Sequence, residues 1–173
     1  MRRTALKVAI PMFAGVCMLF AGIKTDFDHS TNFGQYKTYS WVGAPKATDD
    51  LWAERIEKDV DEQLAAKGWT KVGSGGNAMV SAFGRTHNEQ TLETYYTGFG
   101  GGWRWRGGFG DAMTTVENTP VGTLIVDVFD GQSKKLVWRG TSTETLSSKP
   151  EKNERKLEKA VAEMFKKFPP TQG

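Results

Sequence analysis

Residues 121–142 carry the clearest alternation of apolar and polar side chains along the chain. The apolar positions are Leu124, Val126 and Val128 before the turn sequence of residues 130–134, and Leu136 and Trp138 after it. A period of two with β-branched residues is typical of a strand, and Asp-Gly is typical of a turn. The pattern predicts a hairpin in which Val128 faces Leu136 and Val126 faces Trp138, because this register gathers large apolar groups on one face. The opposite face would hold Ile125, Phe129 and Val137.

A first amphipathic helix is predicted between the capping residue, Asp49 or Asp50, and about Lys67. Its apolar stripe repeats every four residues, at Ile56, Val60 and Leu64. Gly68 follows the last turn, where glycine commonly ends a helix.

A second amphipathic helix is predicted to run to about Phe168, before two prolines. Ser148 and Glu151 have the spacing of a capping box at its start, with Pro150 in the first turn. Its apolar face consists of Leu157, Val161, Met164, Phe165 and Phe168.

Shorter alternating stretches predict further strands on both sides of the first helix. They lie at residues 23–27, 38–42, 69–72, 79–83, 92–97 and 114–117. Two amphipathic helices and a run of strands joined mainly by short turns are typical of an α+β fold. We therefore expect one domain over residues 22–170: an antiparallel sheet with both helices packed on one face, as a two-layer sandwich.

The first 21 residues have the pattern of a secretory signal peptide. Arg2 and Arg3 precede an apolar run that ends in small residues, and cleavage is predicted after Ala21. Cys17 is the single cysteine, and a lipid anchor at this residue is an alternative. Val16 just before it departs from the small residue that lipoprotein processing needs, so a cleaved signal is favoured over a lipid anchor or an uncleaved anchor.

The charge of the chain after the leader is balanced. The whole chain has 23 Lys and Arg and 20 Asp and Glu, and the leader holds Arg2, Arg3 and Lys7 but no acid. The remainder therefore carries 20 of each sign. Zero net charge argues against a nucleic-acid partner.

No motif for catalysis or for a cofactor is present. His29 and His87 are the only histidines, and they form no HExxH or i, i+4 pair. No GxSxG sequence exists, and no cysteine remains beyond the leader. Asp127 and Asp130 could form a carboxylate pair, but a solvent-facing strand position and the turn explain them better. We predict no catalytic residue, no metal site and no cofactor, and hence no enzyme.

The candidate for ligand contact is the segment of residues 98–110, GFGGGWRWRGGFG. Alternation would place Trp103 and Trp105 on one side and Arg104 and Arg106 on the other. Exposed indoles can stack on sugar rings, lipid head groups or another protein, and arginine can hold an anion. The alternative is that the indoles fold back as a lid over apolar surface, which is favoured because tryptophan is seldom left exposed.

Several short motifs in sequence order together resemble the bacterial envelope family called domain of unknown function 4136. These motifs are Asp26-Phe27-Asp28, Phe33, residues 36–41, residues 64–69, the two strands at 122–127 and 136–140, and Phe168-Pro169-Pro170. The sequence departs from the family pattern at Cys17 and at Asn77, where an acidic residue is common. The resemblance covers nearly all of the chain after the leader.

The resemblance implies a location and a fold but no chemistry, because members look like exported proteins, often lipoproteins, without an assigned activity. We therefore expect an exported, non-enzymatic cell-envelope protein, periplasmic or held at the outer membrane. It would act as a structural or interaction module, with unknown partners among envelope proteins, glycans or lipids. The alternative is a binding module whose residues 98–110 contact a glycan, a lipid or an anionic ligand.

Overall fold

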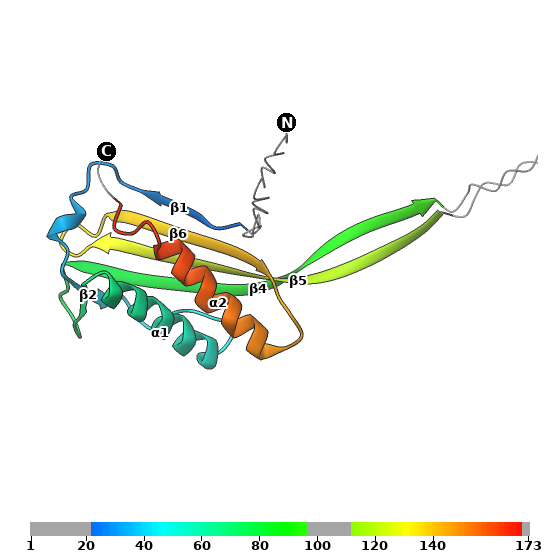
Figure 1. Ribbon diagram of the computed structural model, residues 1–173, viewed down its shortest axis with the longest axis horizontal. Coiled ribbons are helices and arrows are strands. Elements are labelled where there is room, and N and C mark those ends of the chain that lie inside the picture. Colours follow the sequence, from blue (N-terminus) through cyan, green and yellow to red (C-terminus); the bar gives the residue numbers. More distant parts are fainter. Residues whose placement is uncertain (1–21, 97–111, 171–173) are drawn as a thin grey trace, which may run out of the picture.

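The computed structural model describes residues 22–96 and 112–170, with side chains described outside residues 91–115. The elements are β1 (Lys24–Phe27), the 3-10 turn η1 (Phe33–Gln35), β2 (Thr38–Trp41), α1 (Asp50–Ala66), β3 (Thr70–Lys71), β4 (Ala78–Tyr96), β5 (Ala112–Asp130), β6 (Leu136–Thr145) and α2 (Pro150–Phe165). Figure 1 shows the two helices lying together against a single sheet. The expected α+β fold is confirmed.

The sheet has six strands in the order β1-β6-β5-β4-β2-β3 and is mixed. Strands β1, β6, β5 and β4 pair antiparallel, whereas β2 runs parallel to both β3 and β4. The expected antiparallel sheet is therefore mostly right and differs at this edge, where β2 pairs in parallel. The reason is connectivity: the 17-residue helix α1 carries the chain from β2 to β3, and such a crossover brings strands side by side in parallel.

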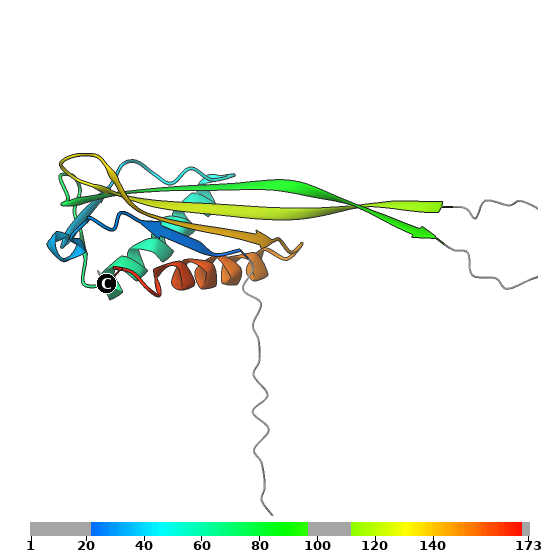
Figure 2. The same ribbon diagram turned by 90° about the horizontal axis from the view of Figure 1, so that it is seen from above.

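Strands β4 and β5 form one uninterrupted hairpin of 19 residues each, paired from Ala78–Asp130 to Tyr96–Ala112. The separate strands predicted at residues 79–83, 92–97 and 114–117 are parts of this hairpin. Strand β6 accompanies β5 only as far as the pair Val121–Thr145. Beyond it, residues 88–96 and 112–120 form a two-stranded ribbon, which we call the arm, that extends away from the helices (Figures 1 and 2).

The register of β5 and β6 differs from the predicted one by two residues. Val128 pairs with Trp138 and Val126 with Gly140, and a bulge skips Val137 before Phe129 pairs with Leu136. Because the shift is even, Val126, Val128 and Trp138 still share the helix-facing side of the sheet. The bulge reverses the expected burial beside the turn, since Val137 is buried and Leu136 is exposed.

Helix α1 begins and ends at the predicted signals. The Asp49 carboxylate accepts a hydrogen bond from the Trp52 backbone N–H at 3.0 Å, and Gly68 after the helix has a φ of +80°. The capping box predicted for α2 is wrong, because Lys149 is its N-cap and makes no side-chain cap bond. Instead, the Asn153 side-chain amide accepts a hydrogen bond from the backbone N–H of Ser147 and donates one to the backbone carbonyl of Ser147. Helix α2 ends at Phe165, one turn earlier than expected.

The core lies between the helices and one face of the sheet. A Cβ at Gly84 would meet the Ile56 side chain of α1, and a Cβ at Gly140 would meet Met164 of α2, so both helices cover the same face. Phe168, which follows α2, is 2% exposed, and its ring centroid lies 5.1–6.0 Å from those of Phe33, Trp69, Trp138 and Phe165. This aromatic cluster joins η1 and the segment after α2 to the sheet.

Candidate functional site

The predicted ligand contacts Trp103, Arg104, Trp105 and Arg106 lie outside the described residues, as do the leader and Cys17. The structure does place the two ends of the segment that contains these contacts. Tyr96 and Ala112 pair with each other at the last rung of the arm. Residues 97–111 therefore start and finish at the end of the arm that is farthest from the core (Figure 1).

The arm leaves both of its long edges without a strand neighbour among the described residues. The final backbone bond from the β6 side is Leu146 N–H to the carbonyl of Pro120. On the other side, the final backbone hydrogen bond runs from the Gly84 N–H to the Lys46 carbonyl. The described side chains beyond these points are mainly polar, and Val116 is 51% exposed. Open strand edges carry unpaired N–H and C=O groups, which can accept an added strand.

A cavity of about 160 Å³ lies where the arm leaves the sheet, between α1, α2 and the strands β4, β5 and β6. Six apolar side chains line it, Trp52, Ile56, Leu124, Leu146, Leu157 and Ala160, together with the polar residues Thr48, Arg85, Thr86, Thr123, Ser142, Glu144, Asn153 and Lys156. Among the polar residues of the wall, Asn153 bonds the backbone of Ser147, and Lys156 Nζ donates to the Thr145 carbonyl at 2.7 Å. The cavity is suited to binding a small apolar group.

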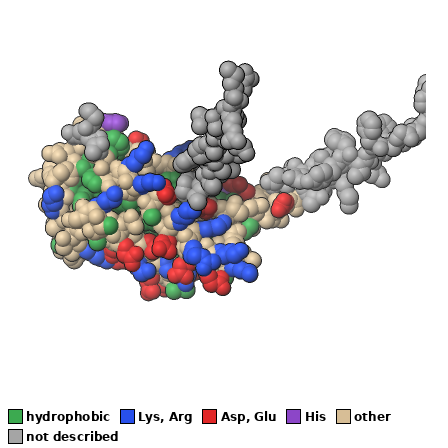
Figure 3. Space-filling view, viewed as in Figure 1, with side chains coloured by type: hydrophobic (Ala, Val, Ile, Leu, Met, Phe, Trp, Pro, Cys, Tyr) green, Lys and Arg blue, Asp and Glu red, His purple; other side chains and the backbone are tan. Residues whose placement is uncertain are grey.

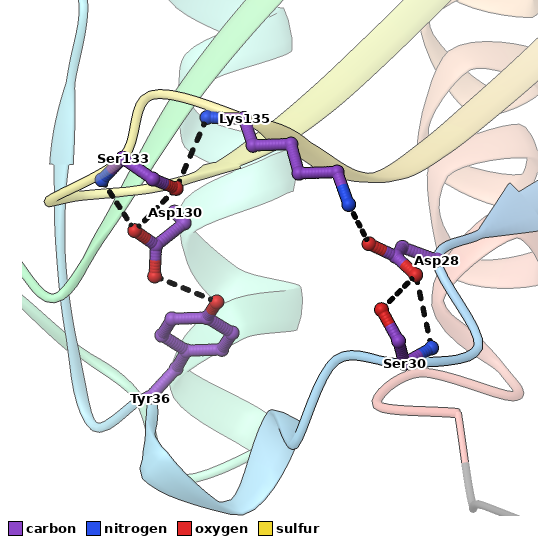
Figure 4. Close-up of polar contacts among 6 residues, drawn as sticks. All are labelled: Asp28, Ser30, Tyr36, Asp130, Ser133 and Lys135. Atoms are coloured by element: carbon purple, nitrogen blue, oxygen red, sulfur yellow. Dashed lines mark hydrogen bonds and ion pairs between the residues drawn. The ribbon is translucent and has the colours of Figure 1, made fainter.

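The opposite end of the sheet carries a cluster of polar contacts between two loops (Figure 4). Asp130 accepts hydrogen bonds from the Ser133 backbone and hydroxyl at 2.6 and 2.8 Å and from the Tyr36 hydroxyl at 2.9 Å. The Ser133 backbone N–H and hydroxyl lower the pKa of Asp130. Burial, reinforced by the bond to Asp130, raises the pKa of Tyr36. The predicted role of Asp130 as a turn residue is confirmed.

An ion pair completes this cluster. Lys135 Nζ lies 2.6 Å from Asp28 Oδ2, and Ser30 donates to the other oxygen, which together hold the pKa of Asp28 far below its usual range. A polar cavity of about 350 Å³ adjoins the cluster, lined by residues that include Tyr36, Asn77 and Asp130. Because its carboxylates are already engaged, the cluster is suited to holding the loops together rather than to acid–base chemistry.

Asp127 lies on the sheet face opposite the helices, but it is not a free solvent-facing group as expected. Arg139 on the neighbouring strand donates two hydrogen bonds to its carboxylate at 2.6 and 2.7 Å, and Asp127 is 9% exposed. Asp127 and Asp130 thus bond to separate partners. Within the described residues, no group of three His, Cys, Asp or Glu side chains could hold a metal ion.

The two histidines lie on different elements. His29 follows β1, is exposed and has its ring 4.3 Å from that of Phe27. His87 lies on β4 at the base of the arm, with Nε2 3.6 Å from Glu89, and its buried Nδ1 has no hydrogen-bond partner among the described residues. Neither histidine has a described serine or cysteine as a hydrogen-bond partner.

Two further features of the described residues bear on binding partners. None of their helices is long and apolar enough to cross a membrane. Acidic and basic side chains intermingle over the helix layer in Figure 3, without a large area of one sign on that face.

The chain was compared with known families, curated proteins and solved structures. The model of the family described as "Domain of unknown function (DUF4136)" matches residues 23–170. No curated protein matches the chain. A PDZ domain protein from Parabacteroides distasonis is similar with a TM-score of 0.57 at 13% identity, and the match covers 87% of this chain and 36% of that one. The chain thus spans about a third of that protein's length, and the likeness extends to the fold alone.

Two other solved structures are similar at lower scores. The PelC dodecamer from Paraburkholderia phytofirmans has a TM-score of 0.47 at 14% identity, with 83% of this chain and 96% of that chain covered. Lipoprotein GNA1162 from Neisseria meningitidis has a TM-score of 0.41 at 10% identity, with 75% and 98% covered.

Proposed function

The chain belongs to the DUF4136 family of domains of unknown function, and on this premise we propose that it is an exported, non-enzymatic protein of the bacterial cell envelope. In this proposal it acts as an interaction module and uses its arm to reach a partner. The signal-like first 21 residues and the resemblance to envelope proteins support export.

The observation that carries the proposal is the arm itself. Apart from the bond from the Leu146 N–H to the Pro120 carbonyl at its base, the strands of the arm pair only with each other among the described residues, so they add little to the core. A two-stranded ribbon alone is marginally stable in water, and ordering each of its residues costs about 1–2 kcal/mol of backbone entropy. A partner that pairs with the open edges or covers a face of the ribbon would offset this cost.

The engaged carboxylates support the non-enzymatic part of the proposal. Asp28, Asp127 and Asp130 are held by Lys135, Arg139 and Ser133, respectively, which leaves them poorly placed to exchange protons with a substrate.

A second candidate function is ligand binding by Trp103, Arg104, Trp105 and Arg106. The pairing of Tyr96 with Ala112 favours it, because it carries both ends of this segment away from the core. The indoles and guanidinium groups would then suit a glycan, a lipid or an anionic ligand.

Removal of the arm tests the leading proposal. We expect that replacing residues 88–120 by an Asn-Gly turn leaves the Tm within a few degrees, because none of the described residues in this range belongs to the core. The same variant, purified from residue 22 onward, should no longer co-sediment with isolated envelope fractions to which the intact protein binds.

A double variant, Trp103→Ala with Trp105→Ala, separates the two candidates. It should still co-sediment if the arm makes the contact and should be released if the indoles make it. Equal retention of the intact protein and the arm-deleted variant would contradict the proposal that the arm binds a partner.

A further inference from the structure

The cavity at the base of the arm does not depend on the arm binding a partner, because it is formed by the sheet and the two helices. On the helix-facing side, neighbouring strands carry small residues there: Gly84 on β4, Gly122 on β5 and Ser142 on β6. Ile56 packs directly over Gly84, where an added Cβ would lie 3.0 Å from a methyl carbon of Ile56. Leu146 packs in the same way over Gly122, where an added Cβ would lie 2.9 Å from a methyl carbon of Leu146. Between these two contacts the sheet and the helices stay apart, which leaves the space of about 160 Å³.

Ser142 is the polar residue of the cavity wall that is buried as a whole. It pairs with Leu124, lines the cavity and is only 3% exposed. No described residue hydrogen-bonds to its hydroxyl, whereas Asn153 and Lys156 on the same wall are bonded to backbone groups. Among the described buried side-chain atoms only His87 Nδ1 is enclosed without a partner, so the Ser142 hydroxyl is accessible from the cavity, where a bound molecule can hydrogen-bond to it.

The size and lining of the cavity define what that partner can be. A dry cavity of about 150 Å³ in another protein accommodates benzene, so this one has room for a ring of six carbons. We propose that the cavity binds one small amphiphilic molecule of about the size of phenol. Such a ligand has an apolar ring or short chain against Leu124, Leu157 and Ala160, and a single hydroxyl or carbonyl group bonded to Ser142.

This ligand class is favoured over the end of a lipid chain. A hydrocarbon tail that entered methyl group first would fill the apolar space but leave the Ser142 hydroxyl buried without a partner, which is unfavourable. A molecule that carries one oxygen atom fills the same space and satisfies the hydroxyl.

Phenol and toluene are suitable probes, because they are similar in shape and differ in the hydroxyl group. We expect each to cause saturable NMR shifts of the methyl groups of Ile56, Leu124 and Leu157 in the purified protein. Methyl groups of Val128 and Val161, which are buried but do not line the cavity, should stay unchanged. Absence of saturable shifts at the cavity methyl groups with either probe would overturn the proposal.

Three variants test the role of Ser142. Ser142→Ala keeps the space and should raise the ratio of the phenol to the toluene dissociation constant by about 3- to 10-fold, the worth of one hydrogen bond. Ser142→Leu should fill the space and abolish the shifts with both probes. Thr143→Leu, on the exposed side of the same strand, is the matched control and should bind both probes normally.

The alanine variant keeps the test decisive even if Ser142→Leu fails to fold. An unchanged phenol-to-toluene ratio in Ser142→Ala would mean that the hydroxyl does not contact the ligand, and would overturn the assigned ligand class.

Discussion

Replacement of Phe168 by alanine is expected to lower the free energy of unfolding by about 3–5 kcal/mol, the usual cost of deleting a fully buried phenylalanine. Phe168 is 2% exposed and packs against rings from η1, the α1–β3 connection, β6 and α2. Its removal would leave a cavity that four separate segments would have to close. Urea or thermal unfolding of the purified protein measures the effect.

Phe83→Ala is the matched control for this substitution. Phe83 lies on the sheet face opposite the helices and is 44% exposed, so the same change should cost less than about 1 kcal/mol. A similar loss in the two variants would contradict the placement of the aromatic cluster at the centre of the core.

Replacement of Asp59 by asparagine is expected to stabilise the protein by about 1–2 kcal/mol at pH 7 and by little at pH 4. Asp59 lies on α1, is 8% exposed and accepts no hydrogen bond from a described residue. Burial is the main cause that raises its pKa to about 6, and Glu62, Glu158 and Glu154 add to the rise while Lys58 opposes it. An ionised Asp59 is therefore unfavourable in the folded protein.

The direction of the pH dependence follows from this raised pKa. Between about pH 4 and 6 the folded protein retains a proton at Asp59 that the unfolded chain releases, so the stabilising contribution is complete at low pH and is lost as the pH rises through about 6. Denaturant unfolding at several pH values should show the difference between Asp59→Asn and the native protein growing from pH 4 to 7. Glu54→Gln, an exposed change on the same helix, should show no such growth.

The parts of the fold that were predictable are those with local signals. The Asp49 cap, the stripe at Ile56, Val60 and Leu64, and the stop at Gly68 all act within one helix, and they located α1 to within about one residue at each end. The register of β5 and β6 was less accessible, because a shift of two residues keeps every side chain on the same face. The bulge at Val137 depends on the geometry of the turn between β5 and β6, and the alternation of apolar and polar residues carries no information about that geometry.

The arm was missed for a different physical reason. Alternation of apolar and polar residues reflects burial of one face of a strand, and residues 88–90, Asn-Glu-Gln, at the start of the arm are all exposed. The sequence could therefore indicate short strands on both sides of this stretch but not their union into one hairpin.

The cavity and Ser142 were also missed, because each small residue is unremarkable in its own strand. Gly84, Gly122 and Ser142 become a site only when strand pairing gathers them around Leu124 beneath the helices: Gly84 and Ser142 pair with Leu124 from either side, and Gly122 lies two positions along β5. A search for small residues at helix-facing positions of neighbouring strands could have found them once the register was known. The predicted contacts Trp103, Arg104, Trp105 and Arg106 lie outside the described residues and stay a prediction.

The central claim is that the arm is the part of the molecule that meets a partner, and site-specific photo-crosslinking in living cells tests it most directly. A photoreactive amino acid at Asn118, exposed on the arm, is compared with one at Glu158, exposed on α2. We predict a discrete crosslinked product from Asn118 that is absent from Glu158. No product from Asn118, or the same products from both positions, would contradict the claim.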